Sequence, residues 1–253
     1  MDISLFVKIG IIVLTIVLLI GLGIKFLPDA ITVSNNGRKR DLPIYCVDTT
    51  AKKVALSFDA AWGNLDTQNI LDILAKNDVK VTFFMTGEWV NKYPDDVKAI
   101  AAAGHDLGNH SENHKQMSLL SAEQCASEIM MVHKRVKDLT EIDMTLFRPP
   151  FGDYNNTLVG VARDCKYYTI QWDIDSLDWK DYGVESIINK TVNHNKLGNG
   201  SIILMHNGAK YTPQALQAVI TGIKEKGYEI VPISQLIYTG DYKVDHTGRQ
   251  FEK

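Results

Sequence analysis

Two histidines four residues apart have the spacing in this sequence that best suits a metal ion. His110 and His114 enclose the run His-Ser-Glu-Asn-His, and this spacing predicts that both imidazoles lie on one side of a single helical turn. Neutral imidazole nitrogens favour zinc or a neighbouring transition ion over magnesium or calcium. We therefore expect a transition-metal site at His110 and His114.

Other chemically capable side chains lie at or just after the ends of short apolar runs elsewhere in the chain. They are Asp59, Arg148, Asp173, Asp175, Asp178 and His206. Each alone has a structural explanation, because an aspartate after a strand can cap the next helix and an arginine before two prolines can fix a turn. Their recurrence after successive runs indicates instead that they gather at one edge of the fold.

Short β-rich runs alternate with helical patterns, and this alternation must position those side chains. The predicted strands are Val54–Phe58, Val81–Met85, Asp106–Asn109, Thr145–Arg148, Tyr167–Trp172, Ser201–Met205 and Tyr228–Val231. The predicted helices are Thr67–Lys76, Asp95–Ala103, Ser121–Leu139, Asn156–Asp164, Val184–His194 and Pro213–Lys226. The order predicts an α/β fold, a distorted (β/α) barrel of about seven strands rather than an open doubly wound sheet. Such barrels carry their chemistry at the carboxyl ends of the strands.

Composition and short motifs exclude several classes of protein. The 253 residues include 27 Lys and Arg against 30 Asp and Glu, a formal charge of −3, which supplies no cationic field for binding nucleic acid. No Gly-x-Gly-x-x-Gly or Gly-x-x-x-x-Gly-Lys follows the first predicted strand, so nucleotide binding is not indicated. Cys46, Cys125 and Cys165 form no Cys-x-x-Cys pair, and we expect buried thiols rather than a zinc ribbon or a disulfide framework.

The first 27 residues predict a transmembrane signal anchor. From Leu5 to Leu27 the chain is apolar except for Lys8, Thr15 and Lys25, and as a helix it would extend about 34 Å. No small-residue cleavage site follows, which favours a retained anchor over a removed signal peptide. A polar linker over 28–42, an α/β domain over 43–240 and a polar C-terminal tail over 241–253 complete the predicted organisation.

Five ordered segments of the sequence resemble a known family. They are Ser57-Phe58-Asp59-Ala60-Ala61-Trp62-Gly63, His110-Ser111-Glu112-Asn113-His114, Arg148-Pro149-Pro150-Phe151-Gly152, Asp175-Ser176-Leu177-Asp178-Trp179 and Leu204-Met205-His206. In this order they resemble the motifs of the polysaccharide deacetylase family, also called the NodB-homology or carbohydrate esterase family 4 domain, over about residues 50–238. The first segment is most similar to that of the sporulation-associated PdaB-like members.

The resemblance implies a hydrolase of carbon–nitrogen bonds. In it a metal-bound water attacks the carbonyl of an N-acetyl group on a glycan, peptidoglycan in this case, which releases acetate and leaves a free amine. Asp59 matches the general base and Arg148 the residue that keeps it ionised. His206 matches the general acid, and Asp175 matches the carboxylate that holds the tautomer of His206 and raises its pKa.

The resemblance also implies the groups that bind the metal and the substrate. His110 and His114 match metal ligands, most simply for zinc. The backbone N–H of Phe151 matches a donor to the developing oxyanion. Trp179 and Leu204 match the apolar walls that receive the acetyl methyl group.

One position departs from the family pattern. The first motif usually has two adjacent aspartates, the base and then a metal ligand, and here the second is Ala60. Loss of a ligand carboxylate should lower the affinity for metal. Water could fill the vacant position, Asp59 could become a ligand, or Glu112 or Asp66 could approach, and the sequence leaves these three options open.

The implied substrate bears on location and on the alternatives. An enzyme for wall glycan must face outward, so we expect a single-pass membrane protein with an extracytoplasmic domain, with the envelope of the forespore or spore as one setting. The charges flanking the predicted anchor by themselves favour a cytoplasmic domain, which would suit an intracellular hydrolase of a small amide. Ala60 favours another alternative, a catalytically impaired glycan-binding protein. The sequence leaves the choice between N-acetylglucosamine and N-acetylmuramic acid open.

Overall fold

The computed structural model describes residues 40–253. The predicted membrane anchor over residues 1–27 and most of the predicted linker over 28–42 lie outside the described residues. Between residues 40 and 253 no helix combines the length and apolar character needed to cross a membrane.

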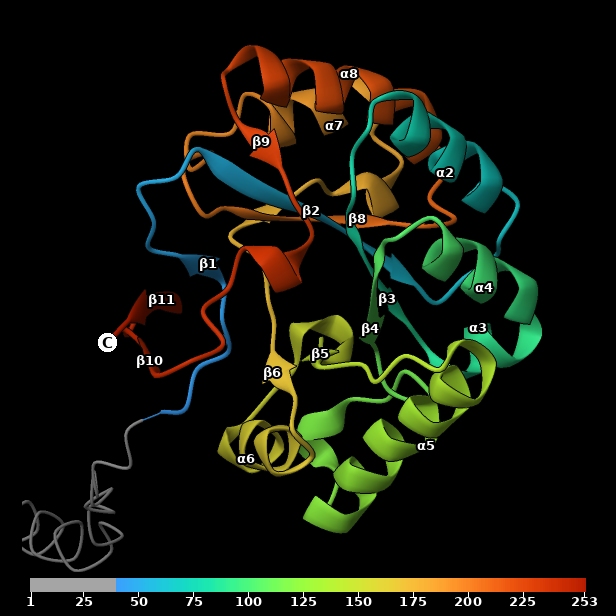
Figure 1. Ribbon diagram of the computed structural model, residues 1–253, viewed down its shortest axis with the longest axis vertical. Helices are drawn as coiled ribbons and strands as arrows, with labels where there is room; N and C mark the ends of the chain where they lie inside the picture. Colours follow the sequence, from blue (N-terminus) through green and yellow to red (C-terminus); the bar gives the residue numbers. More distant parts are fainter. Residues whose placement is uncertain (1–39) are drawn as a thin grey trace, which may run out of the picture. The chain divides into compact units, whose positions relative to one another are not determined.

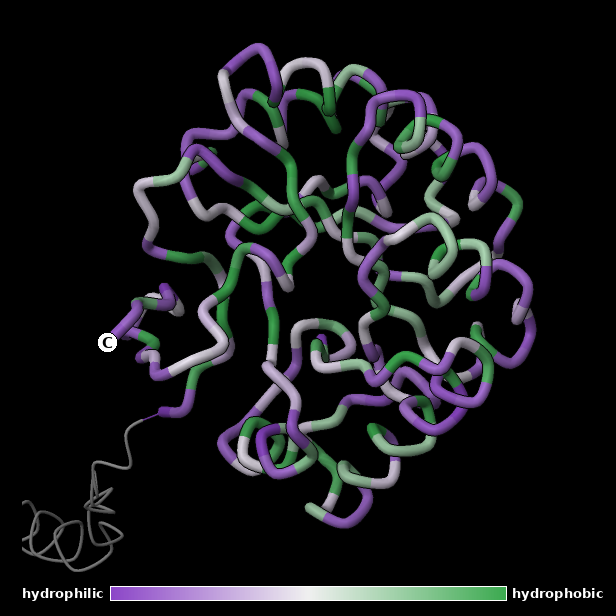
Figure 2. Tube along the Cα trace, in the orientation of Figure 1, coloured by the Kyte–Doolittle hydropathy of each residue, from purple (hydrophilic) through white to green (hydrophobic). Residues whose placement is uncertain are grey.

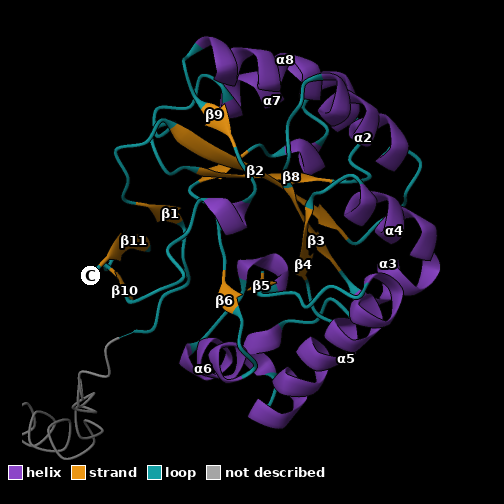
Figure 3. Cartoon of the chain, viewed as in Figure 1, coloured by secondary structure: helices purple, strands orange, loops and turns teal. Residues whose placement is uncertain are grey.

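Strands and helices alternate through most of the described chain (Figures 1 and 3). The strands are β1 Cys46–Val47, β2 Lys53–Ala60, β3 Thr82–Met85, β4 Asp106–Asn109, β5 Leu146–Phe147, β6 Tyr168–Thr169, β7 Ile174–Asp175, β8 Ile202–His206, β9 Glu229–Ile230, β10 Tyr242–Val244 and β11 Arg249–Glu252. The α-helices are α2 Thr67–Lys76, α3 Gly87–Lys92, α4 Pro94–Ala102, α5 Ala122–Thr140, α6 Asn156–Asp164, α7 Val184–Thr191 and α8 Thr212–Glu225. Short 3₁₀ turns are η1 Met117–Leu119, η2 Pro150–Gly152, η3 Asp178–Lys180 and η4 Ile233–Gln235.

The main sheet is parallel and open. Its strand order is β6-β5-β4-β3-β2-β8-β7, with β9 paired to β2, and every pairing in it is parallel. β6 and β7 follow one another in the chain but form the two ends of this order. The helices cover the outside of the curved sheet (Figure 1). The prediction of a distorted α/β barrel with about seven strands is therefore confirmed as a half-barrel.

A short segment at the start of the domain spans the gap between β6 and the start of β8. The N–H of Ile44 donates to the Thr169 carbonyl (2.8 Å), and the N–H of Val47 donates to the Gly200 carbonyl (2.9 Å). Gly200 has φ +80°, and a Cβ at this position would overlap the Val47 carbonyl oxygen. Only glycine fits this close backbone approach, so residues 44–47 can close the seam of the barrel.

Strand β2 sets the two sides of the barrel wall. Leu56, Phe58 and Ala60 pack in the core cluster shared with the helices, whereas Ala55 belongs to the inner cluster. Side chains of a strand alternate between its faces, and Asp59 lines the cavity on the inner side. Figure 2 shows hydrophilic and hydrophobic stretches alternating along the outer helices, as expected for helices that bury one face.

The structure contains elements that the sequence pattern did not predict. Helix α3 and strand β7 lie within segments predicted as loops, and the helix predicted over Val184–His194 ends at Thr191. Residues 241–253, predicted as a polar tail, instead form β10 and β11. β11 pairs in parallel with β1, so that Cys46 faces Arg249, and it pairs antiparallel with β10. Because β11 pairs with a strand about two hundred residues away in the sequence, its own local sequence pattern does not predict this pairing.

Gln250 fixes this C-terminal unit to the domain. Its side chain is fully buried, its amide nitrogen donates to the Tyr238 carbonyl (2.7 Å), and its amide oxygen accepts the Tyr238 N–H (2.9 Å). Gln250→Ala leaves both backbone groups of Tyr238 unsatisfied, and we expect a loss of about 1–3 kcal/mol in the free energy of unfolding. Urea unfolding measures it. The control Gln214→Ala, on the exposed face of α8, should change the free energy of unfolding by less than about 0.5 kcal/mol. Equal losses in Gln250→Ala and Gln214→Ala would show that the C-terminal strands do not stabilise the domain.

Candidate active site

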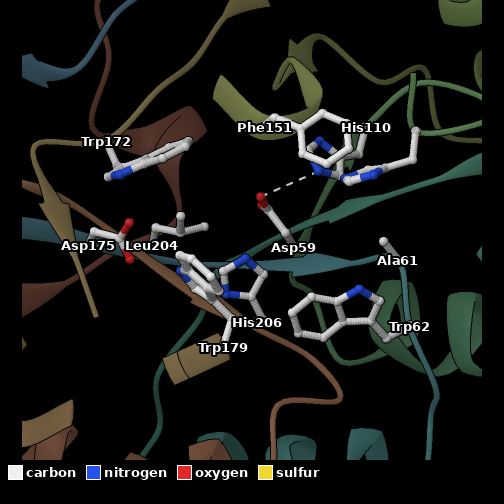
Figure 4. Close-up of a pocket in the computed structure, with 11 residues that line it drawn as sticks. Asp59, Ala61, Trp62, His110, Phe151, Trp172, Asp175, Trp179, Leu204 and His206 are labelled. Atoms are coloured by element: carbon white, nitrogen blue, oxygen red, sulfur yellow. Dashed lines mark ion pairs between the residues drawn. The ribbon is translucent and has the colours of Figure 1, made fainter. Parts of the chain in front are cut away.

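A cavity of about 510 Å³ lies at the carboxyl ends of the strands. Its lining residues are Asp59, Ala61, Trp62, His110, His114, Phe151, Trp172, Asp175, Trp179, Leu204 and His206 (Figure 4). Every site residue predicted from the sequence lines it except Arg148. The strand ends therefore bring together side chains that lie up to about 150 residues apart, as the barrel prediction requires.

Arg148 lies behind Asp59 and holds it. The guanidinium is fully buried; its Nη1 donates to Asp59 Oδ1 (2.7 Å), and its Nη2 donates to Ser57 Oγ (2.9 Å) and to the Gln171 carbonyl (3.2 Å). The cation also lies over the ring of Phe84, 4.1 Å from its centroid. Asp59 is thus oriented by a cation that reaches neither solvent nor the cavity.

The surroundings of Asp59 keep its carboxylate ionised. Burial alone would raise the pKa of Asp59, but the charges of Arg148, His110 and His206 outweigh burial and lower the pKa below the usual 3.8. Asp59 Oδ2 lies 3.5 Å from His110 Nε2 (dashed in Figure 4). The arrangement can therefore supply a proton acceptor at neutral pH.

The two histidines meet through a loop and not through a helical turn. Ser111 and His114 both have left-handed backbones, with φ +65° and +50°, and the N–H of His114 donates to Ser111 Oγ (3.1 Å). The rings of His110 and His114 lie with centroids 5.0 Å apart. His110 Nδ1 lies 2.7 Å from the Arg148 carbonyl, which directs Nε2 into the cavity. The predicted convergence is present, but the predicted helical geometry is wrong.

These residues do not complete a metal site of the usual kind. Across the described part of the chain, no cluster of three or more His, Cys, Asp or Glu side chains is arranged to hold a metal ion. Ala60 is fully buried in the core cluster shared with the helices, and its methyl group supplies no donor atom for a metal. Two imidazoles alone do not fit a divalent ion that takes three protein ligands, so no step of the chemistry below passes through a metal.

Two carboxylates considered as replacements for the missing ligand are engaged elsewhere. Glu112 is buried and pairs with Arg135, Oε1 to Nη2 at 2.7 Å. Asp66 Oδ2 accepts the N–H of Gly208 (2.9 Å) and lies at the start of α2. Neither lines the cavity, so the option that Glu112 or Asp66 approaches the histidines is wrong for this structure.

Asp178, and not Asp175, holds His206. Asp178 Oδ1 lies 2.7 Å from His206 Nδ1, and Oδ2 accepts the His206 N–H (2.7 Å) and the Thr212 hydroxyl (2.6 Å). Asp175 lines the cavity, but its Oδ1 accepts the N–H of Leu177 (2.8 Å) in a tight turn. Leu177 has a left-handed backbone, φ +51°, which turns the chain so that Asp178 faces His206. The role predicted for Asp175 belongs to Asp178.

Asp178 shifts the pKa of His206 in the direction opposite to the shift of Asp59. Burial alone would lower the pKa of His206, but the hydrogen bond and charge of Asp178, with smaller contributions from Asp59 and Asp175, raise it above the usual 6.5. A base and an acid with pKa values moved in opposite directions thus share one cavity. This split is the condition for acid–base catalysis of hydrolysis.

Trp62 and Trp172, to which the sequence analysis gave no role, form much of the cavity wall together with Phe151. Trp62 stacks on His206 with ring centroids 5.1 Å apart and an interplanar angle of 15°. Trp172 also lines the cavity and lies on the opposite side of Asp59 from Trp62 (Figure 4). Phe151, with a left-handed backbone at φ +60°, packs edge-on against His114 at 4.4 Å. These side chains make the cavity mostly apolar, which suits the methyl group and the ring faces of an acetylated sugar.

Comparison with known proteins identifies the family. The family model described as polysaccharide deacetylase matches residues 47–170. A peptidoglycan-N-acetylglucosamine deacetylase of Bacillus cereus is 34% identical over 196 residues, which cover 76% of this chain and 91% of that protein. The chain belongs to the polysaccharide deacetylase family. Relatives in this family are named as hydrolases of N-acetyl groups on peptidoglycan, as the five motifs predicted.

Two further relatives are an uncharacterized protein and a protein described as a pseudoenzyme. YlxY of Bacillus subtilis, an uncharacterized protein, is 32% identical over 195 residues, 77% of this chain but only 60% of that protein. The structure of BA3943 from Bacillus anthracis, described as a carbohydrate esterase family 4 pseudoenzyme, matches with a TM-score of 0.74 and 33% identity over 83% of this chain and 73% of that one. A mutant of BA3943 with restored activity has a TM-score of 0.74 and 36% identity, covering 77% of this chain and 70% of that one.

The buried pair of Arg148 and Asp59 should dominate the stability of the site. Arg148→Met leaves the Asp59 carboxylate buried without a partner, and we expect a loss of about 3–5 kcal/mol in the free energy of unfolding. Thermal and urea unfolding test this. Arg163→Met removes an exposed pair with Asp41 and should cost less than about 1 kcal/mol. Similar losses in the two variants would mean that the buried pair is not essential to the fold.

The assignment of Asp178 predicts the titration of His206. Asp178→Asn removes the adjacent negative charge, so the pKa of His206 should fall relative to the wild type, and the protonated ring should be lost at lower pH. Asp175→Asn is the matched control, and it should lower that pKa less, because Asp175 contributes least to the shift. NMR titration of the imidazole signals measures both. An equal or larger fall in Asp175→Asn would restore the role first predicted for Asp175.

Proposed function

We propose that this protein is a peptidoglycan N-deacetylase, which hydrolyses N-acetyl groups of cell-wall amino sugars and releases acetate. The observation that carries the proposal is the convergence of two side chains on one mostly apolar cavity: Asp59, which is paired with Arg148, and His206, which is hydrogen-bonded to Asp178. The names of related peptidoglycan deacetylases support the substrate class.

The chain's own residues account for the proton transfers. The Asp59 carboxylate accepts a proton from the attacking water, and His206, held through Nδ1, donates a proton from Nε2 to the departing amide nitrogen. The backbone N–H of Phe151 is proposed to face the developing oxyanion. Leu204 and Trp179 lie together on one side of the cavity (Figure 4) and are proposed to receive the acetyl methyl group. A carbonyl placed between Asp59 and His206 would complete the arrangement.

A second candidate function is glycan binding with little turnover. Ala60 favours it, because a buried methyl group stands where the family pattern has a metal-ligating carboxylate. The similarity to a pseudoenzyme of the same family supports it as well. A zinc or other transition ion on His110 and His114 stays a prediction, and its affinity separates the two candidates.

Asp59 and His206 should be indispensable for acetate release. Asp59→Asn removes the base and His206→Ala removes the acid, and each should lower kcat/KM on N-acetylated glycan fragments by about 10²–10⁴-fold with the fold intact. Enzymatic acetate determination measures turnover, and circular dichroism checks folding. The exposed residues His246 and Asp95 supply the control variants His246→Ala and Asp95→Asn, which should retain activity. Near-normal rates in either site variant would refute its role.

Ala60→Asp tests the dependence on a metal. If the deacetylase proposal holds, the wild type releases acetate, and Ala60→Asp, which adds a carboxylate, binds zinc about tenfold or more tightly than the wild type and releases acetate faster with the metal. Calorimetric titration and acetate release give the two readouts, with Ala60→Asn as a control of equal size but no charge. A wild type without bound metal or acetate release, under conditions where Ala60→Asp is active, would establish the binding protein instead.

We further propose that the domain faces outward from the membrane, because peptidoglycan lies on that side. This places the predicted anchor of residues 1–27 in the cell membrane, and a role in the envelope of the forespore or spore follows the PdaB-like resemblance. Accessibility of Lys253→Cys to an impermeant thiol reagent, in a variant without Cys46, Cys125 and Cys165, tests the orientation. Labelling only after lysis would favour the intracellular hydrolase.

A further inference from the structure

A second cavity of about 540 Å³ adjoins the active-site cavity. The two share Trp172 and Asp175, which lie on the same side of the catalytic centre in Figure 4. The other lining residues of this second cavity are Tyr45, Asp173, Leu177, Lys190, His194, Asn195, Lys196 and Thr247. It therefore extends the space around the reacting group toward the seam of the barrel.

The seam elements build the wall of the second cavity. Tyr45 comes from the segment that crosses the gap between β6 and β8, and Thr247 comes from the turn between β10 and β11. The N–H of Tyr45 donates to the Gly248 carbonyl (2.8 Å), which ties the two sides together. The small sheet that the sequence pattern missed thus shapes a space beside the active site.

Side chains of both charges line the second cavity. Both carboxylate oxygens of Asp173 already accept hydrogen bonds, one from the Ile202 N–H (2.8 Å) and one from the Ser201 hydroxyl (3.1 Å). Burial raises the pKa of Asp173 to about 6. Asp175 keeps one oxygen, Oδ2, that accepts no hydrogen bond from the described residues. Asp175, which lines both cavities, therefore offers a hydrogen-bond acceptor.

Two lysines also line the second cavity. Lys190 is half-buried at the end of α7, and Lys196 is exposed in the loop before β8. Within residues 40–253 neither ammonium group forms an ion pair or a hydrogen bond. Burial first, and then the charges of Lys196 and Lys190, lower the pKa of His194, which also lines the cavity. Both ammonium groups are therefore near one part of the cavity lining, and neither has a direct ion-pair partner among the described residues.

We infer that the second cavity is a binding subsite for a carboxylate-bearing neighbour of the sugar that is deacetylated. The inference rests on the proposed function and narrows its substrate to acidic stretches of peptidoglycan. The ring of the neighbouring sugar would lie near Trp172 and donate a hydroxyl hydrogen bond to Asp175 Oδ2, while its carboxylate would lie between Lys190 and Lys196. A neutral N-acetylglucosamine chain would leave both lysines unpaired.

Calorimetric binding of three glycan fragments tests the subsite. The fragments are the neutral tetramer of N-acetylglucosamine, a peptide-free fragment with free muramic acid carboxylates, and the same fragment with stem peptides. The double variant Lys190→Gln/Lys196→Gln should bind acidic fragments about three- to tenfold more weakly than the wild type and the neutral tetramer equally well. Added salt should diminish the preference of the wild type. The matched control Lys76→Gln/Lys98→Gln removes two exposed charges outside both cavities and should change nothing.

The outcomes separate this subsite from the proposed function. A loss confined to the peptide-free fragment identifies the muramic acid carboxylate as the ligand, and a loss confined to the peptide-bearing fragment identifies the stem peptide. Unchanged binding of the acidic fragments by the double variant, or an equal loss for the neutral tetramer, overturns the subsite while acetate release still supports the deacetylase. Absence of binding by all three fragments overturns the subsite together with the glycan substrate.

Discussion

The ion pair of Arg148 and Asp59 is the interaction on which the site depends. A buried guanidinium and a buried carboxylate are each unfavourable alone, and only their contact, with the added hydrogen bonds from Arg148 to Ser57 and Gln171, makes both tolerable inside the barrel. The pair joins β2 to the segment after β5, so the same contact that keeps the base ionised also connects strands from different parts of the sheet.

A second hydrogen-bonded pair, Asp178 and His206, complements the pair of Arg148 and Asp59. Asp178 makes two contacts with His206 at the end of β8 and also accepts a hydrogen bond from the Thr212 hydroxyl. Its effect is opposite to that of Arg148, because it favours the protonated form of the ring. Trp62 covers one face of that ring. The described residues thus lower the pKa of the base and raise that of the acid, and the imidazoles of His110 and His114 lie beside them in the same cavity. This acid–base arrangement is present although Ala60 stands where the family pattern has a metal-ligating carboxylate.

The seam of the half-barrel links the architecture to recognition. A closed barrel would bury the edges of β6 and β7 against one another, but here residues 44–47 and the sheet of β1, β11 and β10 occupy that region. The resulting space beside Trp172 and Asp175 is polar and is lined by two lysines that form no ion pair with the described residues, in contrast to the aromatic cavity of the reacting group. The opening of the sheet therefore creates room for more of the substrate than the acetyl group alone.

The sequence by itself determined the alternation of strands and helices and most of the residues that line the active-site cavity. Helices Thr67–Lys76 and Asn156–Asp164 lie where their periodicity predicts them, because burial of one helix face leaves a local pattern. Tertiary structure alone decided which aspartate reaches His206, since the left-handed turn at Leu177 selects Asp178 over Asp175. It also decided the loop geometry of the histidine pair and the pairing of β11 with β1. These features depend on single backbone dihedral angles and on contacts between distant segments, which no periodicity in the sequence records.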